Sequence, residues 1–259
     1  MTNSSQKLGT NCAMKGGVTP DSIIVFLKRR EFFIGLMFVA FLTFFGRQVW
    51  PYYAPIDATA ALRFFEAIAL QSDDLYAGDD APGLRRWSTD SGIREFKVRI
   101  STIGIEDRTE LVMDRLSVVE PWIGMRFRLV GDGETADIIF RYVRLEDIQG
   151  PTAPKGLLCL TSARRRDGLL QDGLSITISR ENEFCLDHEI LHALGMPGHW
   201  NGKYARSALG SRWLNLSTNF TKWDEIALRT LYDPRLKPGV DGKEALSLAG
   251  EIIGELVSN

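Results

Sequence analysis

The chain lacks an excess of charge of either sign, and it has no internal repeat and no low-complexity tract. Its 31 Lys and Arg residues and 33 Asp and Glu residues are interspersed and give a formal net charge of −2, which argues against a nucleic-acid-binding surface. The short tract Arg164-Arg165-Arg166 lies between two strand-like runs and is predicted to be a solvated hairpin tip. A length of 259 residues suffices for one catalytic domain and a short additional segment.

The chain has only three histidines, and all three fall between positions 188 and 199, in the run HEILHALGMPGH. On a helix, His188 and His192 are four residues apart, so both imidazoles project from one face and can bind the same metal ion. Glu189 lies about 100° round the helix axis, which suits a carboxylate that activates water rather than a third ligand. We therefore predict that His188, His192 and His199 bind Zn²⁺ and that Glu189 is the general base.

An ordinary helix with solvated histidines is the alternative, since HExxH also arises by chance. Two features of the same segment favour the metal site. Gly195 can end the helix in the left-handed conformation that only glycine adopts cheaply. Met196-Pro197-Gly198-His199 then fits a type II turn, with proline and glycine at its central positions, which would direct the third imidazole toward the metal.

The segment resembles the metzincin metallopeptidases, whose pattern HExxHxxGxxH is matched at positions 188, 189, 192 and 195. The family places its third histidine at 198, where this chain has Gly198, and His199 follows one residue later. No methionine follows Met196, so the methionine turn of the family is absent or replaced. The run TKWDEIALRTLYD at 221–233 is similar to the C-terminal metzincin helix. Over residues 83–257 the chain is most similar to a bacterial envelope family of metzincin-like domains of unknown function.

This resemblance implies an α+β domain with a mixed sheet over the HExxH helix, and hydrolysis of a polypeptide substrate. In the mechanism that we expect, Glu189 takes a proton from a zinc-activated water and delivers it to the leaving amine. Tyr204 follows His199 by five residues and is a candidate hydrogen-bond donor to the tetrahedral intermediate, although a tyrosine packed in a loop is the alternative.

Two further interpretations of the site stay open. One is a non-catalytic envelope binding module with a metzincin-like fold and a structural or vestigial zinc site. The other takes its third ligand from the downstream helix, as gluzincins do, with Asp224 or Glu225 in place of His199. Their position beside Thr221, a candidate helix cap, favours a capping role for these carboxylates.

The N-terminal region has no uncharged run as long as the roughly 20 residues that a bilayer requires. Residues 32–45 are nevertheless largely apolar, with Lys28-Arg29-Arg30 before them and Arg47 and aromatic residues after them. We predict a cytoplasmic tail over 1–30, a single-pass transmembrane signal anchor over 31–52, and a domain on the periplasmic or extracellular side. The alternative is a cleaved signal peptide, for which Ala58-Thr59-Ala60 is the nearest cleavage sequence.

Cysteine is as rare as histidine, with three residues in the chain. Cys12 belongs to the polar tail. Cys159 lies in a strand-like run and Cys185 precedes His188 by three residues, so a bridge between them would clamp the start of the metal-binding helix to the sheet. In an exported domain we predict this disulfide, whereas two buried free thiols would be expected in the cytosol.

Periodicity and turn residues divide the remainder into a linker with a helix over 53–82 and a domain over 83–259. Asp57 is predicted to cap the linker helix, which would be a stalk or a packing helix. Pro121 is predicted to stop the second expected helix, which begins near residue 106. The expected strands cover 96–100, 125–129, 136–143, 157–161 and 174–179, and the expected helices cover 57–70, 106–120, 182–194, the run from 221, and 242–257.

Overall fold

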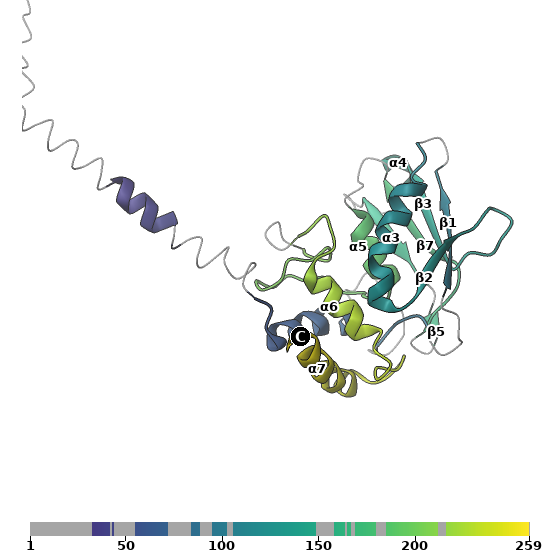
Figure 1. The fold of residues 1–259 in the computed structure, drawn as a ribbon. Coiled ribbons are helices and arrows are strands. Elements are labelled where there is room, and N and C mark those ends of the chain that lie inside the picture. The colour runs from purple at the N-terminus through teal and green to yellow at the C-terminus, as the bar shows by residue number, and fades with distance from the viewer. Residues whose placement is uncertain are drawn as a thin grey trace, which may run out of the picture. The chain divides into compact units, whose positions relative to one another are not determined.

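The computed structural model describes most of the chain from residue 55 onward and a short stretch before it (Figure 1). The described residues are 33–41, 43, 55–71, 84–88, 95–102, 106–148, 158–163, 165–166, 169–179, 185–211 and 216–258. By its internal contacts the chain divides into two compact units, residues 1–49 and residues 50–259.

In the first unit, residues 33–41 are helical and their side chains are exposed. Across the described part of the chain, no helix has both the length and the apolar character needed to cross a membrane. The rest of the predicted anchor, its flanking charges at 28–30 and 47, and Cys12 lie outside the described residues.

The second unit is an α+β domain built on a mixed five-stranded sheet in the order β2-β1-β3-β7-β4. The first four strands are parallel, and β4 pairs with β7 in the antiparallel sense at one edge. All five predicted strands are confirmed. Their bounds are β1 Glu95–Ser101, β2 Arg126–Leu129, β3 Ile138–Val143, β4 Cys159–Ser162 and β7 Leu174–Ser179.

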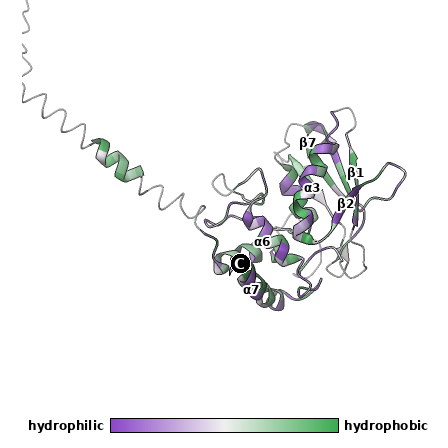
Figure 2. Ribbon diagram, viewed as in Figure 1, coloured by the Kyte–Doolittle hydropathy of each residue, from purple (hydrophilic) through white to green (hydrophobic). Residues whose placement is uncertain are grey.

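Alternation along the strands produces one buried face, which packs against α3 (Thr109–Ile123) and α5 (Leu186–Ala193) (Figures 1 and 2). Val98 of β1, Phe140 of β3 and Ile176 of β7 are fully buried there. Thr161 of β4 pairs directly with Ile176, so its side chain shares this face. Leu129 ends the edge strand β2 and is 43% exposed.

The prediction that Pro121 stops the second helix is wrong, because α3 continues to Ile123. A proline this close to the C-terminus removes one backbone hydrogen bond, and the burial of Ile123 offsets that loss. The helix ends instead at Gly124, which has a φ of 68°. Helix α5 begins at Leu186, after Cys185, and the earlier residues of the predicted helix, 182–184, lie outside the described residues.

The predicted linker helix is a packing helix of the domain. It consists of α2 (Ala58–Phe65) and a π-helical turn, η3 (Glu66–Leu70), and Asp57 caps it by accepting a hydrogen bond from the Ala60 amide at 2.9 Å. It packs against α6 (Lys222–Leu231) and α7 (Gly242–Ser258). The Phe64 ring lies edge-on to Trp200 and Trp223, with centroids 5.5 and 5.6 Å apart.

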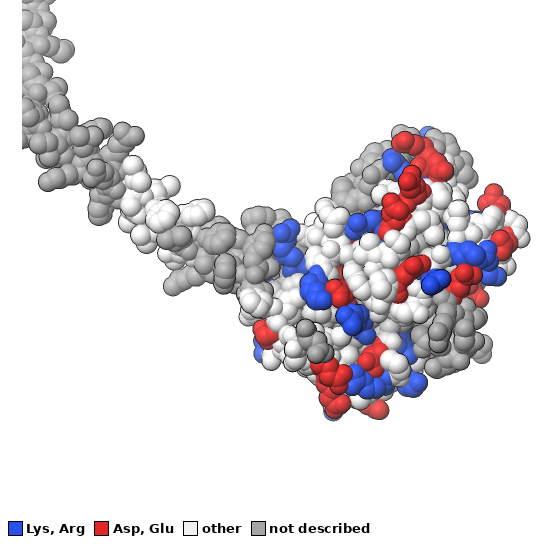
Figure 3. Space-filling model, in the orientation of Figure 1, with Lys and Arg blue, Asp and Glu red and all other residues white. Residues whose placement is uncertain are grey.

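The remaining elements are the short helix α4 (Leu145–Ile148) and an antiparallel pair, β5 (Arg165–Arg166) and β6 (Leu169–Leu170). The prediction of a hairpin tip is wrong for Arg165 and Arg166, because both lie in β5 and pair with Leu170 and Leu169. Basic and acidic side chains are interspersed over the face shown in Figure 3. Arg235, for example, pairs with both Asp233 and Glu255.

Candidate metal centre

Helix α5 is fixed at its head by a disulfide bond between Cys185 and Cys159, the first residue of β4. Their Cα atoms are 6.3 Å apart, and the predicted pairing is confirmed. One residue before His188, the buried Asp187 forms a bidentate ion pair with Arg115 of α3 and accepts the Phe220 amide at 2.7 Å. The N-terminal end of α5 is therefore held by one covalent bond and one ion pair.

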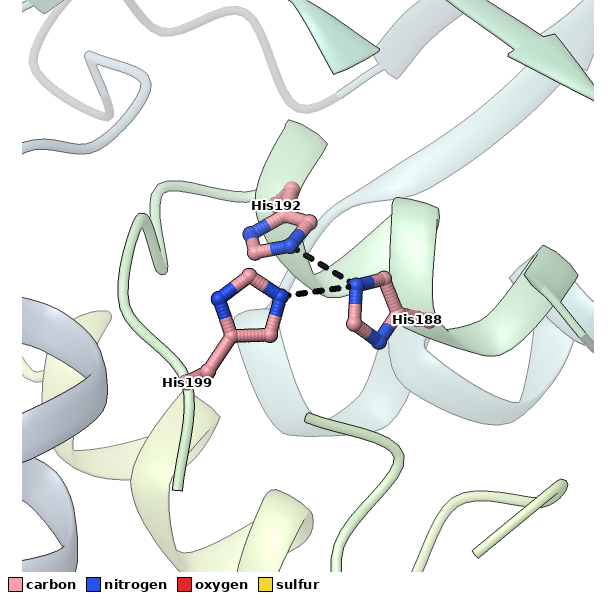
Figure 4. A group of neighbouring side chains, drawn as sticks. All are labelled: His188, His192 and His199. Atoms are coloured by element: carbon pink, nitrogen blue, oxygen red, sulfur yellow. Dashed lines mark hydrogen bonds between the residues drawn. The ribbon is translucent and has the colours of Figure 1, made fainter. Parts of the chain in front are cut away.

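The structure brings the three predicted histidines together, with their Nε2 atoms facing one another (Figure 4). The Nε2 atom of His188 is 3.0 Å from that of His192 and 3.1 Å from that of His199. Zn–N bonds of about 2.0–2.1 Å in tetrahedral geometry would separate two ligand nitrogens by roughly 3.3 Å. The three imidazoles are thus close enough to bind one metal ion.

The backbone partners of two rings determine where their protons lie. His188 Nδ1 is 2.8 Å from the Ala208 carbonyl oxygen, and His192 Nδ1 is 2.6 Å from that of Met196. A carbonyl oxygen only accepts, so both Nδ1 atoms carry hydrogen and both neutral rings present an Nε2 lone pair. Two lone pairs 3.0 Å apart repel each other unless a cation lies between them. This donor set fits a metal ion.

Burial also keeps the two helix histidines neutral. It lowers the pKa of His188 to about 4, an effect that the nearby His199 reinforces and the hydrogen bond to Ala208 opposes. Burial and the two other imidazoles lower the pKa of His192 well below its usual value. Since metal binding requires the neutral imidazole, the site is ready to bind a metal ion at neutral pH without releasing protons from these rings.

Glu189 lies on the buried side of α5, and only 2% of its surface is exposed. Thr161 donates a hydrogen bond from its hydroxyl to the Glu189 carboxylate at 2.5 Å. Burial raises the pKa of Glu189 to about 7, against the lowering effect of that hydrogen bond. Thr161 and His192 both line a cavity of about 40 Å³. Glu189 is thus linked to this cavity through Thr161, its hydrogen-bond partner.

The loop between Gly195 and His199 differs from the predicted type II turn. Gly195 has the positive φ expected at a helix end, 105°. A type II turn requires a positive φ at its third residue, and Gly198 does not have one. A glycine is needed at this position for another reason. A Cβ at 198 would lie 2.5 Å from the Gln71 carbonyl oxygen and closer still to that of Ala67. The Gly198 amide also donates to the Ile68 carbonyl of η3 at 3.0 Å, so close packing against η3 positions His199.

The described residues do not support a downstream carboxylate as third ligand. Asp224 is fully buried and forms the predicted capping box with Thr221. Glu225 forms ion pairs with Lys222 at 3.0 Å and Arg229 at 3.3 Å. The cluster of potential ligands found in the described part of the chain contains the three histidines and neither carboxylate.

Tyr204 is 47% exposed, in the loop that follows His199. Its proposed hydrogen bond to a reaction intermediate stays a prediction.

Sequence reasoning did not identify several residues that support the site. Thr161 could have been found, because strand alternation places it on the same face as Cys159, whose bridge to the head of α5 was predicted. Trp87 donates from its indole to the Ala193 carbonyl at 2.8 Å, and the Tyr232 hydroxyl donates to the Leu194 carbonyl at 3.1 Å. Both contacts satisfy carbonyls at the C-terminal end of α5, and no local pattern in the sequence predicts them.

The sequence matches no model of a known family and no curated protein. The metzincin resemblance of the motifs stays a prediction.

Proposed function

We propose that this protein is a membrane-anchored, zinc-dependent metallopeptidase of the metzincin type, acting on polypeptides outside the cytoplasm. The observation that carries the proposal is the convergence of three Nε2 atoms, two of which have their lone pairs directed inward by carbonyl partners. Histidine nitrogens are preferred ligands of zinc, and three of them leave a position open for a reactant, as in catalytic zinc sites.

The residues around this position have separable roles. His188, His192 and His199 would hold the ion, which acts as a Lewis acid toward water and a peptide carbonyl when bound. Glu189 would take the proton from water and return it to the leaving amine, and a pKa raised to about 7 suits both steps. Thr161 orients the Glu189 carboxylate through its hydroxyl.

The proposed location rests on the sequence. The basic residues at 28–30 precede the apolar run, which favours a cytoplasmic N-terminus, and the disulfide between Cys159 and Cys185 suits an oxidising compartment.

The decisive experiment compares zinc content and turnover in the full-length chain purified in detergent. Wild type should bind one zinc ion, measured by elemental analysis, and His192→Ala and His199→Ala should lose it. Glu189→Gln should keep the zinc yet lose turnover by roughly 10² to 10⁴, the usual contribution of a general base. Substrates would be an unbiased peptide library and an envelope extract.

Glu225→Gln is the matched control, because this carboxylate pairs with Lys222 and Arg229 on the surface of α6. It should change neither zinc content nor turnover. Undiminished cleavage by Glu189→Gln would contradict the mechanism. A wild type that binds zinc and cleaves neither substrate would instead support a non-catalytic envelope binding module with a structural zinc site.

A further inference from the structure

The carboxylate of Asp224 makes more contacts than a helix cap requires. It lies in the first turn of α6 and is fully buried. Its Oδ2 atom accepts a hydrogen bond from the backbone amide of Thr221 at 2.8 Å, which completes the capping box, and another from the Ala208 amide at 3.3 Å. Its Oδ1 atom accepts a hydrogen bond from the Ser207 hydroxyl at 2.5 Å. One carboxylate therefore joins the start of α6 to a separate loop.

The same loop also contacts one of the proposed metal ligands, His188 of α5. The Ala208 carbonyl accepts the Nδ1 hydrogen of His188 at 2.8 Å. The peptide unit that contains this carbonyl ends in the Leu209 amide, which donates to the Ser207 hydroxyl oxygen at 2.9 Å. A continuous chain of hydrogen bonds thus runs from His188 through this peptide unit and Ser207 to Asp224.

We propose that Asp224 is a positioning residue for the metal centre, acting through Ser207 to fix the Ala208 carbonyl that orients the His188 imidazole. This inference rests on the proposed metal site. The partner of the non-ligating ring nitrogen sets the orientation of a metal-binding histidine and raises its basicity. His192 is oriented independently, since its Nδ1 partner is the Met196 carbonyl, four residues away on the same segment. The effect of Asp224 therefore falls on one ligand of the three.

The test is Asp224→Asn in the full-length chain purified in detergent, with two readouts that do not require turnover. The affinity for Zn²⁺, measured by competition with a chelator, should fall about 10- to 100-fold. The visible absorption spectrum of the Co²⁺-loaded protein should shift, because it reports the ligand geometry. Ser207→Ala interrupts the same chain but leaves the capping box intact, and it should move both readouts in the same direction even if Asp224→Asn fails to fold.

Leu228→Ala is the matched control, because Leu228 is fully buried on the same helix. It should lower the midpoint of thermal unfolding but leave the Zn²⁺ affinity and the Co²⁺ spectrum unchanged. If Ser207→Ala has the affinity and spectrum of wild type, or if Leu228→Ala alters them as strongly, the positioning role is wrong and the metal site stands. If wild type itself binds neither ion, the proposed metal site fails and this inference fails with it.

Discussion

At the scale of single residues, Glu189 couples the stability of the metal-free domain to pH. Burial raises its pKa from the ordinary 4.5 to about 7. The folded state holds this proton more tightly than the unfolded chain does. The contribution of Glu189 to the free energy of unfolding therefore falls as the pH rises from 4.5 through 7. A difference of about 2.5 pKa units corresponds to roughly 3 kcal/mol.

We therefore expect metal-free Glu189→Gln to become more stable relative to metal-free wild type as the pH rises across this range, by roughly 3 kcal/mol in total. Urea unfolding of both proteins in the presence of a chelator at a series of pH values measures the difference. Groups that titrate in both proteins contribute equally to both free energies of unfolding, so their contributions cancel in the difference. A stability difference that is independent of pH would show that Glu189 is not perturbed by burial.

Gly198 is the second residue whose change should reach the site. Gly198→Ala would drive a methyl group into the Ala67 and Gln71 carbonyls, so the loop must move away from η3. We expect destabilisation of about 1–3 kcal/mol and weaker zinc binding, because His199 is the next residue. Gly133→Ala, where a methyl group meets no atom within 4 Å, is the control. Equal zinc affinity in the two variants would contradict this role for Gly198.

At the scale of elements, the disulfide links the edge strand β4 to α5, the helix that carries His188 and His192. It spans 26 residues, and in the chain-entropy model a loop of that length is worth about 3.5 kcal/mol. We expect the Cys159→Ser, Cys185→Ser double variant to lose stability of this order and to bind zinc more weakly, since Cys185 heads the helix that carries His188.

Chemical denaturation of the double variant measures the loss in stability. In wild type, intact-mass analysis after alkylation without reductant should show both thiols blocked. Two alkylated thiols at 159 and 185 would disprove the bond.

Elements with a strong local pattern could be predicted from the sequence. The β7 run alternates apolar residues from Leu174 to Ile178 and forms a strand over the predicted bounds, and Thr221 with Asp224 forms the predicted capping box. The failures occurred where tertiary contacts decide the outcome. The end of α3 depends on burial of Ile123 beyond Pro121, and the backbone at Gly198 depends on η3, about 130 residues earlier in the chain.

At the scale of the whole molecule, the expected arrangement is a cytoplasmic tail, an anchor over 31–52 and an exported domain. In cells whose outer membrane has been opened, protease added outside should reach the domain of the full-length protein, and the purified protein should retain its original N-terminus. Alkaline extraction should leave the protein in the membrane, because an inserted apolar segment is not held there by ionic contacts with the membrane surface. Digestion of the domain only from the cytoplasmic side, or a mature N-terminus near Ala61, would contradict the topology or the uncleaved anchor, respectively.

Residues far apart in the sequence donate hydrogen bonds to the C-terminal end of α5. Trp87 and Tyr232, 145 residues apart, donate to the carbonyls of Ala193 and Leu194. Arg86 reaches the carbonyls of Leu231 and Asp233, and the Gly239 amide donates to Leu84. A growing chain that carries all three histidines, but has not yet reached residue 231, still lacks the contacts made by Leu231, Tyr232, Asp233 and Gly239. The C-terminal end of α5 therefore gains its full set of contacts only after the last histidine has been synthesised.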